Sequence, residues 1–89
     1  MSIEYKFHKS CVRSISVSPC GNYLASGDED SNLVIWHVLN SKIMRKYKLE
    51  NKVIDCVEWN PQKNTCLLAV TNEEFVYLIQ PGLYGREIN

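Results

Sequence analysis

The feature that most constrains the fold of this chain is an internal repeat with a spacing of about 42 residues. Both copies present apolar runs and turn residues in the same order. Three pairs of motifs correspond, the first two at an offset of 42 residues and the third at 44: Val17-Ser18-Pro19 with Trp59-Asn60-Pro61, Leu33-Val34-Ile35-Trp36 with Phe75-Val76-Tyr77-Leu78, and Leu24-Ala25 with Leu68-Ala69. Such a repeat predicts two copies of one structural unit.

Each copy reads as a set of short antiparallel strands joined by turns. The expected strands span residues 12–17, 23–26, 33–38 and 43–49 in the first copy, and 53–59, 66–70 and 75–79 in the second. A leading strand over 3–7 precedes them, and the tail 83–89 could begin a further strand. A period of 40–45 residues with four strands per repeat is typical of a blade of a β-propeller.

We therefore predict an all-β fold with two four-stranded antiparallel blades. The predicted divisions are 1–7, a strand from a preceding blade; 8–49, the first blade; and 50–89, a degenerate and incomplete second blade. Two blades cannot close a propeller, which normally takes at least four. The chain is thus expected to be a fragment of a longer protein or to complete a propeller by self-association.

Composition excludes several classes of function. Ten basic and ten acidic residues give 89 residues a net charge of +0, so no global field draws the chain to nucleic acid or membrane. Neither a signal peptide nor an apolar run near 18 residues is present, which leaves the cytosol or nucleus as the expected location. The four cysteines lack the CxxC spacing of a metal or redox site.

The first copy resembles a WD40 repeat. The matching pieces are His8, Ser18-Pro19-Cys20-Gly21, Leu24-Ala25-Ser26-Gly27, and Asp30 followed by Leu33, Ile35 and Trp36. The resemblance implies a structural hydrogen-bonded tetrad of His8, Ser26, Asp30 and Trp36. In the second copy Leu78 is expected in place of Trp36, Asn72 in place of Asp30, and Val70 opposite Ser26. That copy is therefore predicted to lack the network and to depend on apolar packing.

Both copies together resemble the C-terminal propeller of the block-of-proliferation family of ribosome biogenesis proteins. The distinctive pieces are Trp59-Asn60-Pro61, Leu67-Leu68-Ala69-Val70 and Pro81-Gly82-Leu83-Tyr84-Gly85. The resemblance implies a non-catalytic scaffold in a seven-bladed propeller. It further implies a nucleolar role in large-subunit pre-rRNA processing, in a complex with pescadillo and a second WD-repeat protein. The alternative is a generic WD40 protein-interaction module of another complex.

Two groups of residues could carry other functions. His8, Ser26 and Asp30 could be taken for a catalytic triad, but no GxSxG nucleophile elbow is present, so we expect no enzyme and no cofactor. Lys42, Arg45, Lys46 and Lys48 form a basic strand that could contact RNA or a partner. Lysines also protect strand edges from aggregation, and the neutral net charge favours that role.

Overall fold

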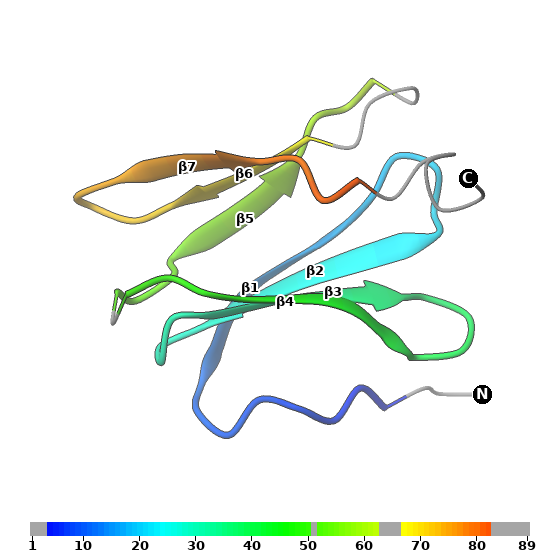
Figure 1. The fold of residues 1–89 in the computed structure, drawn as a ribbon, viewed down its shortest axis with the longest axis horizontal. Coiled ribbons are helices and arrows are strands. Elements are labelled where there is room, and N and C mark those ends of the chain that lie inside the picture. The colour runs from blue at the N-terminus through cyan, green and yellow to red at the C-terminus, as the bar shows by residue number, and fades with distance from the viewer. Residues whose placement is uncertain (1–3, 51, 63–66, 83–89) are drawn as a thin grey trace.

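The fold consists of two antiparallel sheets stacked on each other, with the N-terminal segment beneath the first sheet (Figure 1). This computed structural model describes residues 4–50, 52–62 and 67–82. The strands of the first sheet, in spatial order, are β1 (Val12–Val17), β2 (Tyr23–Asp28), β3 (Asn32–His37) and β4 (Ile43–Lys48). Those of the second sheet are β5 (Cys56–Trp59), β6 (Leu68–Thr71) and β7 (Val76–Ile79). These described residues contain no helix, so the all-β prediction is confirmed.

Local turn chemistry explains why neighbouring strands pair. Between β1 and β2, the N–H of Gly21 donates to the carbonyl of Ser18 at 2.9 Å. Gly21 has φ +81°, a backbone conformation that favours glycine. The hydroxyl of Ser18 accepts from the N–H of Tyr23 at 3.1 Å, which closes the turn. The predicted turn over residues 18–22 therefore fixes the register in which Val17 faces Leu24.

The leading strand predicted over residues 3–7 is not formed by the described residues Glu4–Phe7. This segment instead lies across the face of the first sheet that is turned away from the second. The Tyr5 hydroxyl donates to the carbonyl of Val38 at 2.5 Å. The ring of Tyr5 packs edge-on against the ring of Trp36, with 5.2 Å between the ring centres. A strand needs a partner edge, and none is paired with residues 4–7 in the described part of the chain.

The second sheet has three described strands, and the tail 83–89 lies outside the described residues. The pairing of β6 with β7 shows that the sequence alignment of β7 with β3 is wrong by one position. Leu24 pairs with Trp36 in the first sheet, and Leu68 pairs with Ile79 in the second. Ile79, rather than Leu78, therefore occupies the position of Trp36. Because side chains alternate between the faces of a strand, a shift of one residue changes which face each one occupies.

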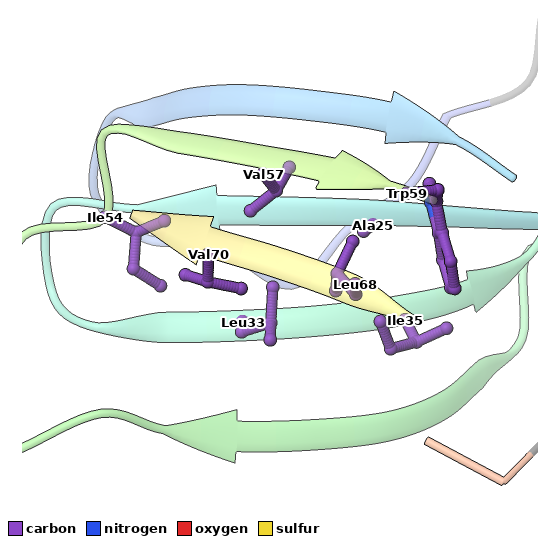
Figure 2. Packing of buried hydrophobic residues seen from close by; sticks show 8 residues of the cluster. All are labelled: Ala25, Leu33, Ile35, Ile54, Val57, Trp59, Leu68 and Val70. Carbon is purple, nitrogen blue, oxygen red and sulfur yellow. The ribbon is translucent and has the colours of Figure 1, made fainter. Parts of the chain in front are cut away.

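The hydrophobic core lies between the two sheets (Figure 2). Both sheets and the segment before β5 contribute to it: Ala25, Leu33, Ile35, Ile54, Val57, Trp59, Leu68 and Val70. Gly27 allows the sheets to approach closely, because a Cβ at this position would lie 3.1 Å from Cβ of Ile54 and 3.3 Å from Cγ1 of Val57.

Both outer faces of this stack also carry apolar side chains. On the first sheet, Ile15 is 62% exposed and Val17 is 56% exposed. On the second sheet, Val76 is 68% exposed and Leu78 is 67% exposed. Exposed apolar residues on two opposite faces indicate that the stack is suited to having a neighbour on each side.

Candidate functional site

A chain of short hydrogen bonds connects four side chains beneath the first sheet. Nδ1 of His8 lies 2.6 Å from Oδ2 of Asp28, and Nε2 of His8 lies 2.6 Å from the hydroxyl of Ser26. The indole N–H of Trp36 donates to the same hydroxyl at 2.9 Å. The side chains of His8 and Asp28 are 6% and 0% exposed. We call these four residues the tetrad.

Three members of the tetrad coincide with the sequence prediction, but the carboxylate does not. The prediction placed Asp30 beside His8, whereas the structure places Asp28 there. Ser26 and Asp28 are two residues apart on β2, so they share a face of the strand. Asp30 lies beyond the end of β2, in the turn, and is exposed. The alternation of the strand was the signal in the sequence that could have identified Asp28.

An arrangement of protons with the His8 ring in its neutral form pairs every member of the tetrad. Ser26 accepts from Trp36, and its hydroxyl proton can then be donated to Nε2 of neutral His8. The Nδ1–H of His8 is directed at Asp28. Ser26 is only 4% exposed and its oxygen accepts from the indole N–H of Trp36, so its hydroxyl is closed to a substrate in this arrangement.

Asp28 also organises the turn between β2 and β3. Its Oδ1 accepts from the N–H of Asp30 at 2.8 Å and from the N–H of Asn32 at 2.9 Å. Burial raises the pKa of the Asp28 carboxyl, but hydrogen bonds from Asn32, His8 and Asp30 lower it by more, so the net pKa is below its ordinary value. Asp28 is therefore held as a carboxylate that joins the loop of His8 to the turn after β2.

The second sheet retains a neutral counterpart of this arrangement at Asn72. Its Oδ1 accepts from the N–H groups of Glu74 at 2.7 Å and Phe75 at 3.1 Å, as Asp28 accepts from its own turn. Its Nδ2 donates to the carbonyl of Val53 at 2.8 Å, which fixes the segment before β5. The second copy packs its apolar residues into the core as expected, and the Asn72 amide adds backbone contacts that the sequence did not indicate.

The predicted basic strand does not present a single surface. Arg45 reaches the carbonyls of Pro81 and Gly82 on the side of the second sheet. The ammonium of Lys46 lies 5.4 Å from the ring centre of Phe7, on the opposite face. Lys48 donates to the carbonyl of Asp30 at the turn, and Lys42 precedes β4 and is exposed. RNA contact by these four residues as one group remains a prediction that this dispersal does not support.

The described residues contain neither a metal-binding cluster nor a membrane-spanning helix. Among the described residues, no three His, Cys, Asp or Glu side chains are grouped so that they could hold a metal ion. A shallow hollow of about 250 Å³ lies beside β5, lined by Glu58, Trp59, Asn60, Pro61, Leu67, Ala69 and Leu78. In the same part of the chain, no helix is long and apolar enough to cross a membrane.

The chain is similar to known proteins along almost its full length. A family model described as WD domain, G-beta repeat, matches residues 2–37. Ribosome biogenesis protein ERB1 of Candida albicans is 38% identical over 93 aligned positions, which cover 98% of this chain and 11% of that protein. Ribosome biogenesis protein bop1 of Danio rerio is 40% identical, covering 96% of this chain and 11% of that protein. Ribosome biogenesis protein bop1-A of Xenopus laevis is 41% identical, covering 96% of this chain and 12% of that protein. The chain thus spans about a tenth of the length of these relatives.

Solved structures show the same architecture at lower sequence identity. The β-propeller domain of Cps50 (Swd1) from Myceliophteria thermophila superposes with a TM-score of 0.79 at 20% identity, over 91% of this chain and 25% of that chain. The structure of U3-55K superposes with a TM-score of 0.73 at 23% identity, over 82% of this chain and 22% of that chain. These superpositions identify the fold as that of propeller blades. Residues 2–37 therefore match the WD40 repeat, and over nearly its whole length the chain is similar to the ribosome biogenesis proteins ERB1 and bop1.

Proposed function

We propose that this chain forms two adjacent blades of a propeller in a ribosome biogenesis factor. Its role there is that of a non-catalytic scaffold for large-subunit pre-rRNA processing and ribosome assembly. The observation that carries the proposal is the 38–41% identity to ERB1 and bop1 over 96–98% of the chain. That similarity includes the second copy, which departs from the general WD40 pattern.

The polar groups of the tetrad support a structural role over a catalytic one. Each of His8, Ser26 and Asp28 is hydrogen-bonded to another part of the blade. An enzyme would need at least one such group directed at a substrate. In this chain the same groups join the N-terminal loop, β2 and β3 into one rigid unit, which suits the presentation of loops to protein partners.

The proposed partners follow from the family resemblance. They are pescadillo, a second WD-repeat protein and the pre-ribosomal large-subunit particle, and the proposed location is the nucleus and nucleolus. Contact with rRNA would be indirect, through these proteins. The surfaces available to partners are the turns at the ends of the strands, because the sheet faces carry apolar residues suited to neighbouring blades.

Purification of the tagged full natural chain tests this proposal. We expect large-subunit rRNA precursors and the two proposed proteins to co-purify, and we expect depletion of the chain to cause those precursors to accumulate. Normal precursor levels after depletion, with co-purification of an unrelated complex, would instead identify a generic WD40 interaction module.

A further inference from the structure

The two sheets meet closely on one side and diverge on the other. The backbones of the two sheets come close together only where β1 and β2 of the first sheet lie beside β5 of the second. Among the described residues, no Cα atom of β3 or β4 comes within 8 Å of one in β6 or β7. Figure 1 shows the sheets separating toward β4 and β7. The wide side must therefore be held by side chains.

Polar contacts already account for the narrow side. The hydroxyl of Ser14 accepts from the N–H of Val57 at 3.1 Å, and the carbonyl of Ser16 accepts from the indole N–H of Trp59 at 2.8 Å. Both contacts join β1 to β5. They leave the angle between the outer strands undetermined, because a hinge along β1 and β5 would preserve them.

Arg45 spans the wide side. It is paired with Ile35 on β3, so its side chain shares the face that is turned toward the second sheet. Its Nε donates to the carbonyl of Pro81 at 3.1 Å, and its Nη2 donates to the carbonyl of Gly82 at 3.4 Å. Its Nη1 donates to the carbonyl of Met44 at 2.8 Å. All three guanidinium nitrogens are thus engaged by backbone carbonyls.

The segment after β7 has a conformation that suits this contact. Pro81 is buried, and its ring restricts φ. Gly82 has φ +71°, which L-residues with a side chain seldom adopt. A guanidinium is planar and presents its donors in a fixed fork, so it holds two successive carbonyls in a set direction, which an ammonium on a flexible stem does not.

We propose that Arg45 is a clamp between the two blades that sets their opening on the outer side and fixes where the chain leaves β7. This clamp does not depend on the proposed role in ribosome biogenesis. It gives Arg45 a structural role in place of the RNA contact considered for the basic strand. A guanidinium that donates to three carbonyls has few donors left for a phosphate. In the described part of the chain, Arg45 forms no ion pair that would compete with the clamp.

Hydrogen exchange measured on the full natural chain tests the clamp. Arg45→Lys keeps the positive charge and loses the fork, Arg45→Gln loses the charge, and Lys42→Gln removes an exposed charge next to the same strand. We expect both Arg45 variants to raise exchange across residues 76–82 about tenfold, the factor for losing one hydrogen bond to a charged group. Lys42→Gln should leave that segment unchanged.

A reference segment and an RNA-binding assay complete the experiment. Exchange across β1 should stay at the wild-type rate in every variant, and binding of a single-stranded RNA oligonucleotide should not distinguish Arg45→Lys from Arg45→Gln. The proposal is overturned by wild-type exchange at residues 76–82 in either Arg45 variant. It is also overturned by an equal rise across β1, which would mean general destabilisation. RNA binding that is lost in Arg45→Gln and kept in Arg45→Lys would assign the residue to a charge contact instead.

Discussion

Asp28 is the residue on which the first blade is most dependent. It is fully buried, and it joins three things at once: the loop of His8, the turn after β2, and, through His8, the pair of Ser26 and Trp36. Removing one partner from such a network leaves buried groups without hydrogen bonds, which costs more than the bond itself contributes.

The carboxyl of Asp28 should make the stability of the fold dependent on acid. Its pKa is lowered on folding, so the unfolded chain binds a proton more readily than the folded one. The stabilisation is present above the ordinary pKa of about 3.9 and is lost as the pH falls through the lower folded value. Urea unfolding at pH 7 and pH 3 measures the difference in the free energy of unfolding, which should be lower at pH 3.

Asp28→Asn supplies the comparison for that measurement. We expect the variant to lose about 1.5–3 kcal/mol at pH 7, as for hydrogen bonds to a charged group, and to show a smaller change between pH 7 and pH 3. Exposed Asp30→Asn is the matched control and should behave like the wild type. Equal effects of the two substitutions would show that the tetrad carboxylate has been assigned to the wrong residue.

Gly27 is required by packing between the sheets and not by its backbone angle. A Cβ at this position would press against Ile54 and Val57, which belong to the buried core. We expect Gly27→Ala to lower the free energy of unfolding by about 1–3 kcal/mol, as overpacking of a core does. Chemical denaturation measures the change. A substitution that costs nothing would show that the sheets can separate at this point without penalty.

Among the elements, Asn72 performs for the second blade part of what Asp28 performs for the first. The amide holds its own turn with its oxygen and the segment before β5 with its nitrogen. Asn72→Asp would keep the first contact and place an oxygen against the carbonyl of Val53. We expect a loss of about 1 kcal/mol at pH 7.

The pH dependence of Asn72→Asp shows whether its loss of stability comes from the lost N–H donor to the carbonyl of Val53. A protonated carboxyl can again donate to the carbonyl of Val53, so the difference from the wild type should narrow as the pH falls below about 4. Urea unfolding of both proteins at pH 7 and pH 3 gives the comparison. A difference that persists in acid would mean that the Asn72 amide does not hold the segment before β5.

Much of the fold could be predicted from the sequence, because it depends on local patterns. The turn residues around Ser18 and Gly21 and the alternation along β1 and β3 placed those strands within a residue or so. Asp28 and the role of Asn72 were missed because a motif was matched by its spacing, whereas the strand decides which side chains share a face. Arg45 could not be predicted at all, since its partners Pro81 and Gly82 meet it only after the two sheets have packed.

The two sheets together form a stack with two apolar outer faces. One carries Ile15 and Val17, and the other carries Val76 and Leu78, all of them more than half exposed. In a propeller each such face is covered by the next blade. We therefore propose that the chain is two blades of a larger ring and needs neighbours on both sides.

Sedimentation velocity of the isolated 89-residue chain over a range of concentrations tests this proposal. Because both outer faces expose apolar side chains, the chain should self-associate as its concentration rises. Leu78→Glu, which places a charge on the exposed outer face of the second sheet, should reduce that association, whereas Glu73→Gln should not. A stable, well-folded monomer at every concentration would contradict the claim that the chain is made to be completed by neighbouring blades.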